Sequence, residues 1–453
     1  MIRFIIVLTA VWTAPAVLPD FLPLSSSAYA AEKEKKKTRR VPALRESTYK
    51  KISEANVMID PESVPREEGE PPPEPTGTPA DAIEMLMEYK DRRGLNSYEK
   101  AQIWNTLAFA YYTIGDMKGT IVAYENVLLQ GVISEALEQQ ALRALYQLHF
   151  GEEDYETALV YIARYEEVRG ELDPLVTFTK ALAYHLLEDI RESLKYALQV
   201  EEIALAQGKE MKEPWYYLQV VDYNMLEDYD NVIRVLETLI HKYPKKQYWM
   251  HLAGMYSEKE WDDKALSAYF ASYHQGFLIR ETEIVMLSQR LLGADNPYEA
   301  SMVLERGLKD GTVTRNEKNL KLLATSYTMA QEMPKAIKAW SDAAGFAKDG
   351  DIHYRLAQAL AQEDRHSEAV RAYRKALEKK GLSKESDVQF WLAIALMNLE
   401  RWDEATRAFR AAERIDRRKQ KSVRQYIRYI SGEKRRQQEL RRMAEETERA
   451  LAS

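Results

Sequence analysis

Residues 104–128 read WNTLAFAYYTIGDMKGTIVAYENVL, and the order of small and large side chains in this stretch recurs along the chain. The small residue Ala108 is followed twelve positions later by Thr120 and, four positions beyond that, by the large Tyr124. Nine segments align to this pattern without a gap, at intervals of 33 to 39 residues. A fixed period of this length is typical of proteins built from one repeated supersecondary unit.

The spacing within each segment predicts a pair of antiparallel helices. Such helices approach closely only where their facing residues are small, and large residues one turn away fill the next groove. The first small position holds Ala108, Tyr146, Ala181, Val220, Ala253, Ser288, Ala324, Ala357 and Ala393. The second holds Thr120, Ala158, Ser193, Val232, Ala265, Ala300, Ala336, Ala369 and Ala405. The residues at the large position are Tyr124, Ile162, Ala197, Leu236, Tyr269, Leu304, Trp340, Tyr373 and Phe409.

Proline usage supports continuous helix. Between residues 80 and 453 there are only five prolines, a residue that is disfavoured inside helices. Pro174, Pro297 and Pro334 fall where helices of the pairs should begin. No alternating β-branched runs joined by Asn-Gly or Asp-Gly turns occur, so the sequence carries no strand signal.

The order of Trp249, Leu252, Ala253 and Tyr256 matches the opening of the tetratricopeptide repeat. We therefore predict an all-α fold, a tetratricopeptide-repeat solenoid of about nine helix pairs over residues 80–417. A helical arm precedes it, and residues 418–453 form a basic capping helix with a charged tail.

The first thirty residues predict export. Arg3 precedes an apolar run from Phe4 to Ala14, and Ala28-Tyr29-Ala30 offers a cleavage site, which is the layout of a signal peptide over residues 1–30. The alternative is an uncleaved N-terminal anchor. We expect a periplasmic protein, secreted across the inner membrane. The chain has no cysteine, which excludes disulfides, thiolate metal ligands and a lipid-modified cysteine.

Residues 31–60 predict an amphipathic arm, followed by a proline- and glutamate-rich linker over residues 61–79. In the segment TRRVPALRESTYKKISEA at 38–55 and the residues after it, an apolar stripe recurs at helical spacing, with Pro42 where a helix could begin. The stripe is Val41, Leu44, Ile52 and Ile59.

This stripe has two interpretations, a cap on the first repeat or a helix that docks a partner. The helix after the linker is better placed to seal the stack, through Ile83, Leu86, Met87 and Lys90. We therefore expect the arm to be free for a partner.

The first helices of stacked repeats commonly line a groove that holds a partner. One face of these helices in the first four units alternates aromatic, amide and guanidinium groups, which suits a bound peptide. The predicted groove residues are Asn105, Phe109, Tyr112, Arg143, Gln147, Phe150, Phe178, Leu182, Tyr217 and Asn224, with His185 and Val221 on the same face. The alternative is that these rings pack against neighbouring repeats.

Catalysis and nucleic-acid binding are disfavoured. The seven histidines show no His-Glu-x-x-His spacing, and neither a Gly-rich phosphate loop nor a nucleophile elbow occurs, so we expect no catalytic residues, metal site or cofactor. A net charge of −7 argues against a nucleic-acid partner. The basic run from Arg417 to Arg442 could instead contact anionic lipid headgroups or an acidic partner.

The arm, the segment NSYEKAQIWNTLAFAYY and the join KYPKKQYWMHLAGMYSEK together resemble the periplasmic tetratricopeptide proteins that accompany TonB systems. The resemblance implies an accessory subunit beside ExbB-like, ExbD-like and TonB-like proteins, which energise outer-membrane uptake of iron chelates or similar nutrients. Its implied partners are ExbD-like or TonB-like periplasmic domains, and it assigns no catalytic residues. The alternative is a general periplasmic scaffold for envelope, polysaccharide or outer-membrane protein assembly.

Overall fold

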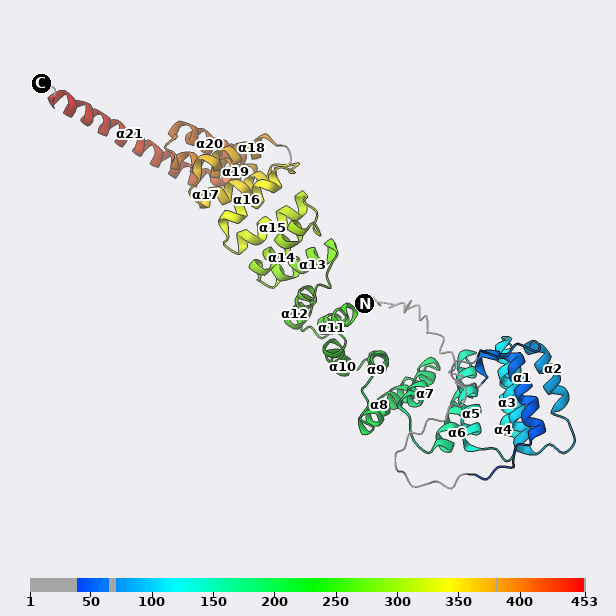
Figure 1. The fold of residues 1–453 in the computed structure, drawn as a ribbon. Helices are drawn as coiled ribbons and strands as arrows, with labels where there is room; N and C mark the ends of the chain where they lie inside the picture. The colour runs from blue at the N-terminus through cyan, green and yellow to red at the C-terminus, as the bar shows by residue number, and fades with distance from the viewer. Residues whose placement is uncertain (1–38, 65–70, 380–381, 452–453) are drawn as a thin grey trace. The chain divides into compact units, whose positions relative to one another are not determined.

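The computed structural model describes residues 39–64, 71–379 and 382–451, and these residues form helices and turns without a strand (Figure 1). The chain divides into two compact units, unit 1 up to Val235 and unit 2 from Leu236. Helices α1–α9 lie in unit 1 and α11–α21 in unit 2, with the boundary inside α10. No helix of the described ranges is long and apolar enough to span a bilayer. The predicted signal peptide lies outside the described residues.

Nine helix pairs follow one another, and we name the two helices of each pair A and B. The pairs are α3 (Ser97–Thr113) and α4 (Met117–Leu129), α5 (Glu135–Gly151) and α6 (Tyr155–Arg169), α7 (Pro174–Leu186) and α8 (Ile190–Ala206), α9 (Glu213–Met225) and α10 (Tyr229–Lys242), α11 (Lys246–Glu258) and α12 (Asp262–His274), α13 (Glu281–Gly293) and α14 (Pro297–Asp310), α15 (Glu317–Met329) and α16 (Met333–Ala344), α17 (Asp351–Gln362) and α18 (His366–Glu378), and α19 (Glu385–Asn398) and α20 (Trp402–Ile415). Before them lie α1 (Glu46–Ile59), the 3₁₀ helix η1 (Pro61–Ser63) and α2 (Pro79–Tyr89). After them come η2 (Arg417–Lys419) and α21 (Gln420–Leu451).

The small residues of the sequence pattern lie where the helices meet. Every residue at the first and second small positions is buried, including the larger Tyr146, Val220 and Val232. Pro174 and Pro297 are the first residues of α7 and α14, and Pro334 is the second residue of α16. The predicted all-α fold with about nine helix pairs is therefore confirmed, because small side chains at these positions let the helix axes approach.

Each turn between an A and a B helix contains one residue in the left-handed conformation, seven positions after the first small residue. These residues are Gly115, Glu153, Glu188, Glu227, Glu260, Asp295, Gln331, Asp364 and Glu400. At Glu153, the N–H of the next residue, Asp154, donates to the carbonyl of His149 at 2.9 Å, the hydrogen bond that closes a Schellman turn. Only the first turn has glycine, the residue that adopts this conformation without steric cost.

Replacing Glu153 with glycine is expected to stabilise the α5–α6 turn by about 0.5–1 kcal/mol, because glycine removes the Cβ crowding of a left-handed residue. The matched control is Glu152→Gly one position earlier, where φ is −84° and glycine only adds flexibility to the unfolded chain. Hydrogen exchange of the α5 and α6 amides measures both effects. Equal shifts in the two variants would contradict the assignment of the turn.

The N-terminal arm packs on unit 1, which corrects the expectation that it stands free. Its helix begins at Glu46 rather than at Pro42, and it lies against α2 and α3. Ala55 and Ile59 are buried in the same core cluster as Leu86 of α2. The capping interpretation therefore describes the observed packing, because α1 and α2 together cover the side of α3.

The predicted stripe of the arm is only partly covered in this arrangement. Ile59 is buried, whereas Val41, Leu44 and Ile52 are half-buried. In α2, Leu86 is buried as expected, but Met87 is 36% exposed, so this helix turns a narrower apolar face to the stack than the sequence suggests. Docking of a partner on the arm stays a prediction.

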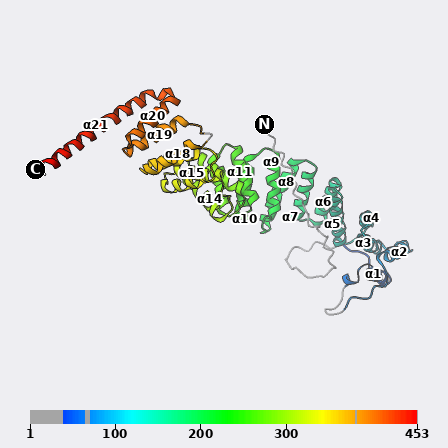
Figure 2. The ribbon, with the colours of Figure 1, turned by 90° about the horizontal axis from the view of Figure 1, so that it is seen from above.

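At the other end of the repeats, α21 caps unit 2. Val423 and Ile430 are buried, and the ring of Tyr426 stacks on Phe409 of α20 with centroids 5.1 Å apart. The helix α21 is continuous to Leu451, and its C-terminal turns run beyond the α19–α20 pair (Figure 2).

Candidate partner-binding face

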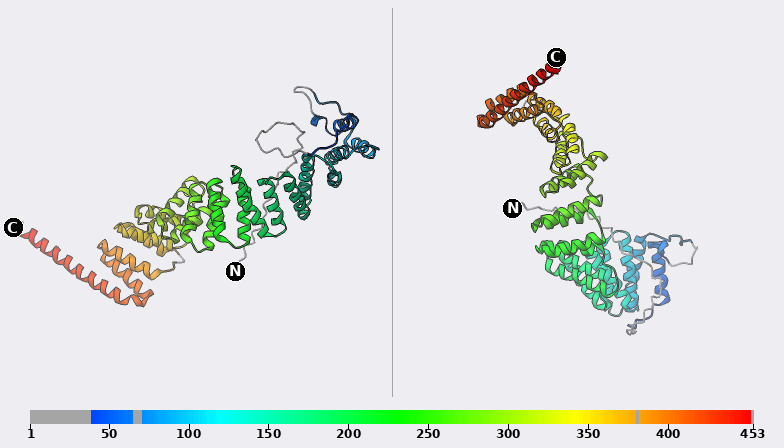
Figure 3. Two further views of the ribbon diagram at one scale, coloured as in Figure 1. Left: turned by 90° about the horizontal axis from the view of Figure 1, so that it is seen from below. Right: turned by 90° about the vertical axis from the view of Figure 1, so that its left-hand side faces the viewer.

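The predicted groove residues lie on the A helices α3, α5, α7 and α9 of unit 1, which succeed one another in the stack (Figure 3). Nine of the ten are half-buried, and Arg143 is exposed. Half-burial means that these side chains support the stack with one side and keep another side open to solvent. That combination suits a preformed binding surface, since little side-chain entropy remains to be lost on binding.

Two of the predicted rings also contact other helices. Phe178 of α7 lies 6.3 Å from Trp215 of α9, centroid to centroid, and Phe150 of α5 lies 5.2 Å from Tyr155 of α6 in an edge-to-face arrangement. The alternative interpretation, packing between repeats, is thus realised in part. It does not exclude binding, because both rings remain partly exposed.

Polar links tie neighbouring A helices together. The amide Nε2 of Gln140 on α5 donates to Oδ1 of Asn105 on α3 at 3.4 Å. A stronger link connects α7 and α9, where Nδ1 of His185 lies 2.7 Å from Oδ1 of Asp222. The spacing between these helices is therefore fixed by side chains of the candidate face itself.

Asp222 is the buried centre of this second link. Its side chain is fully buried, and its second oxygen, Oδ2, accepts a hydrogen bond from Ser193 of α8 at 2.6 Å. Three helices therefore meet on one carboxylate, which orients the imidazole of His185. The side chain of His185 is 20% exposed, so it keeps an open edge on the A-helix face.

Sequence reasoning placed His185 on this face but missed Asp222. The signal was present in WYYLQVVDYNM, where an aspartate interrupts the apolar residues of α9. A charged residue is rarely buried without a partner, so this aspartate required one. The partner could not be identified, because it lies 37 positions earlier in the chain.

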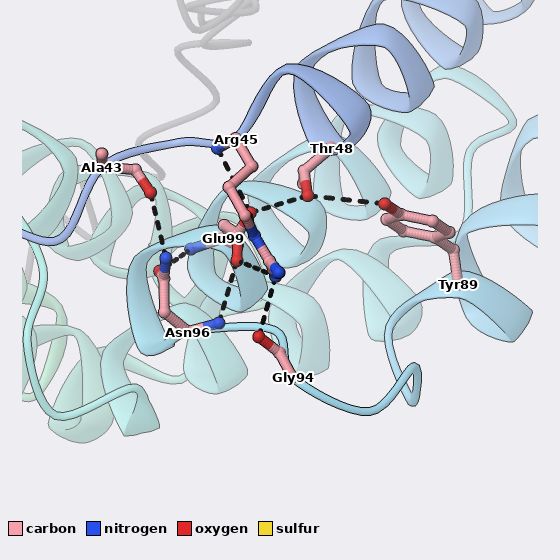
Figure 4. Close-up of polar contacts among 7 residues, drawn as sticks. All are labelled: Ala43, Arg45, Thr48, Tyr89, Gly94, Asn96 and Glu99. Atoms are coloured by element: carbon pink, nitrogen blue, oxygen red, sulfur yellow. Dashed lines mark hydrogen bonds and ion pairs between the residues drawn. The ribbon is translucent and has the colours of Figure 1, made fainter.

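A second buried carboxylate, Glu99, fastens the arm to α3 (Figure 4). The Arg45 guanidinium donates from Nη2 to Oε2 at 2.6 Å and from Nε to Oε1 at 2.8 Å. Thr48 of α1 donates to Oε1 at 2.8 Å, and the backbone N–H of Asn96 donates to Oε2 at 2.9 Å. Both oxygens of a fully buried carboxylate are thus satisfied by the arm and by the helix cap.

Further contacts brace the arm at this point (Figure 4). Nη2 of Arg45 also donates to the carbonyl of Gly94 at 2.8 Å, and Nδ2 of Asn96 donates to the carbonyl of Ala43 at 3.0 Å. The hydroxyls of Thr48 and Tyr89 lie 3.4 Å apart. Asn96 and Glu99 form a capping box at the start of α3, a pattern visible in the sequence NSYE.

Electrostatics favour the ionised form of Glu99. The hydrogen bonds from the Arg45 guanidinium, aided by Asn96 and Thr48, overcome the cost of burial and hold its pKa at about 2, compared with an ordinary value of 4.5. The carboxylate is therefore charged throughout the neutral range, and the ion pair that attaches the arm to α3 requires that charge.

The described residues offer no site for catalysis by a metal. No group of three or more histidine, aspartate or glutamate side chains in these ranges could hold an ion. His149 lies 3.1 Å from Asp154 in its own turn, and His353 is buried, with its pKa lowered by that burial. These histidines serve the helix packing and the turns.

Comparisons with known proteins point to the same repeat class. The family model for the tetratricopeptide repeat matches residues 350–378, which contain α17 and α18. A comparison with curated proteins gives no match. With the register of the nine pairs, the matched unit defines the fold as a tetratricopeptide-repeat solenoid.

Several solved structures are similar at low identity. The crystal structure of MamA is 20% identical, covering 39% of this chain and 94% of that one, with a TM-score of 0.33. A tetratricopeptide repeat protein from Parabacteroides merdae is 13% identical over 62% of this chain and 99% of its own, with a TM-score of 0.33. The C-terminal part of a repeat protein from Cytophaga hutchinsonii is 18% identical over 53% and 95%, with a TM-score of 0.32. Because these TM-scores are low, the repeat class rests on the helix pairs and the matched unit.

Proposed function

We propose that this protein is a non-catalytic scaffold that binds a protein partner along the A helices of unit 1. The observation that carries the proposal is the row of half-buried aromatic and amide side chains on α3, α5, α7 and α9. Rings supply apolar area, and the amide and guanidinium groups supply hydrogen bonds to the backbone of an extended or helical segment. Stacked helix pairs commonly use this face for binding.

We further propose that the scaffold is exported to the periplasm and acts as an accessory subunit of a TonB-type complex. The support is the signal-peptide pattern of residues 1–30 and the resemblance of the arm, the segment NSYEKAQIWNTLAFAYY and the join KYPKKQYWMHLAGMYSEK to periplasmic proteins of TonB systems. The partner would be an ExbD-like or TonB-like periplasmic domain, and the complex would energise nutrient uptake, for example of iron chelates. A general periplasmic scaffold for envelope assembly is the second candidate.

Co-purification of a tagged full-length chain from membranes distinguishes the two candidates. Recovery of ExbB-, ExbD- or TonB-like proteins supports the first. Recovery of polysaccharide-export or outer-membrane assembly proteins in their place would refute it. Deletion of residues 31–80 is a poor companion experiment, because it would remove α1 and uncover the buried side of α3.

Reversing the charge of Arg143 tests the binding face itself. The variant Arg143→Glu is expected to weaken capture of the partner about tenfold or more, because a central arginine of an interface commonly contributes well over 1 kcal/mol. The matched control is Arg164→Glu on α6, an exposed arginine of the same helix pair that lies on the B helix. Quantitative pull-down of the recovered partner is the measurement. If Arg164→Glu reduced recovery as much as Arg143→Glu, the binding face would lie elsewhere.

A further inference from the structure

The C-terminal helix α21 is held in unit 2 by one face only. Val423 and Ile430 are buried, and Nε1 of Trp402 on α20 donates to Oε1 of Gln437 at 3.0 Å. Gln437 donates in turn from Nε2 to Glu400 at 2.8 Å. These contacts span more than three turns and fix the rotation of α21 about its axis, so the opposite face is held towards solvent.

Four cations occupy that opposite face. Lys421, Arg424, Arg428 and Arg435 are all exposed, and their separations of three, four and seven residues align them on one side of a helix. At a rise of about 1.5 Å per residue, the row is about 21 Å long. Between Gln420 and Gln438 the only acidic residue of the helix is Glu433, which pairs with Arg436 at 2.8 Å. We call these four residues the cationic stripe.

Other cations of this region are neutralised by ion pairs. Lys419 pairs with Asp387 at 2.5 Å, and Lys434 pairs with Asp403 at 2.7 Å. Within the ranges that the structure describes, no member of the cationic stripe forms an ion pair or a side-chain hydrogen bond. Lys434 of α21 and Lys419 just before it thus fasten the helix to neighbouring helices of unit 2, whereas the four cations of the stripe face water.

We propose that the cationic stripe binds the anionic headgroups of a phospholipid bilayer. The four cationic side chains lie in one straight row, so they can contact the headgroups of a planar anionic bilayer at the same time. Each lysine or arginine near such a surface contributes about 1 kcal/mol to binding. The chain carries a net charge of −7, so this attraction comes from the stripe and not from the charge of the whole molecule. Val423, Tyr426, Ile427 and Ile430 already pack in the stack, so the charges of the stripe carry the contact with the bilayer surface.

An acidic protein segment fits this face less well than a bilayer. The residues that lie among the cations on the same side of α21 are the exposed Gln425, Ser431 and Gly432, and Tyr429 at the edge of this side is 54% exposed. One ring at the edge is less than the central cluster of anchors that dominates protein interfaces, and a tyrosine also suits the boundary between a bilayer and water. The stripe is also independent of the A-helix face of unit 1, so its loss leaves the proposed partner binding unchanged.

Sedimentation of the full chain with vesicles tests the proposal. The protein is expected to bind vesicles of phosphatidylcholine mixed with phosphatidylglycerol and to dissociate from them at high salt. It is expected not to bind vesicles of phosphatidylcholine alone. Substituting the stripe as K421Q/R424Q/R428Q/R435Q is expected to weaken binding by about three orders of magnitude. The double variant R424Q/R428Q should show an intermediate loss, and circular dichroism checks that both variants keep their helix content.

The matched control removes four exposed lysines of unit 2 that lie outside α21, as K318Q/K321Q/K338Q/K348Q. It changes the net charge by the same amount and is expected to bind vesicles like the unaltered chain. The proposal is overturned if the unaltered chain does not bind the anionic vesicles or binds neutral ones equally. It is also overturned if the control loses as much binding as the stripe variant, or if soluble polyglutamate binds as tightly as the anionic vesicles.

Discussion

Replacing Glu99 with alanine is expected to release α1 from unit 1 and to cost about 3 kcal/mol of local stability. The carboxylate is fully buried and accepts hydrogen bonds from Arg45 and Thr48 of the arm region. Removing one partner of such a pair leaves the other charge without compensation, which is the expensive way to lose a buried ion pair. Because Arg45 is 52% exposed and can be rehydrated, we expect the lower end of the usual range.

Hydrogen exchange of the α1 amides measures this effect, since the arm should open before the repeats do. The control is Glu138→Ala, which removes the partner of Arg39 at 2.6 Å in a pair whose arginine is 48% exposed. That surface pair should contribute less than about 1 kcal/mol. Unchanged protection of α1 in Glu99→Ala would show that apolar packing alone holds the arm.

The same residue makes attachment of the arm depend on pH. The pKa of Glu99 is about 2 in the folded chain and 4.5 as an ordinary carboxyl. Its contribution is therefore fully present above pH 4.5 and is lost as the pH falls towards 2. Protection of α1 should fall over that range in the unaltered chain, whereas Glu99→Gln should show weaker protection at neutral pH and a smaller further loss on acidification.

Replacing Asp222 with alanine is expected to loosen the junction of α7, α8 and α9 by about 3–4 kcal/mol. The substitution leaves His185 and Ser193 without their shared acceptor and opens a small cavity at a fully buried position. The isosteric Asp222→Asn should cost roughly half as much, since the amide oxygen still accepts one hydrogen bond and the serine hydroxyl can rotate to accept the other.

Hydrogen exchange of the amides in α7 and α9 follows this loss. An appropriate control on α8 is Glu192→Ala, which removes an exposed pair with Lys195 at 2.7 Å and should cost less than about 1 kcal/mol. Similar exchange in Asp222→Ala and Glu192→Ala would mean that the buried carboxylate does not join the three helices.

The register of the repeats could be predicted from the sequence because it depends on short-range spacing. Ala108 and Thr120 lie twelve residues apart, and every equivalent pair is buried. Helix starts at Pro174 and Pro297 follow from the fixed φ of proline. Such local signals repeat nine times, so an error in one unit is corrected by the others.

The place of the arm could not be predicted, because it depends on contacts between distant residues. The apolar stripe of the arm fits a cap and a docking helix equally well. The deciding contact joins Arg45 to Glu99, 54 positions later, and NSYE alone identifies Glu99 only as a capping residue. The buried link of His185 with Asp222 was missed for the same reason, although the aspartate in α9 was a visible irregularity.

The helices that cover the first and last repeats limit the head-to-tail association of copies of this chain. Each helix pair has an apolar face that packs against the next repeat. Without a cover, the apolar face of a terminal pair would pack against a second chain as readily as against another repeat. Here α1 and α2 occupy that place on α3, and α21 occupies it on α20. In the part of the chain that the structure describes, both terminal helix pairs are therefore covered against head-to-tail joining of copies, which would produce an open filament.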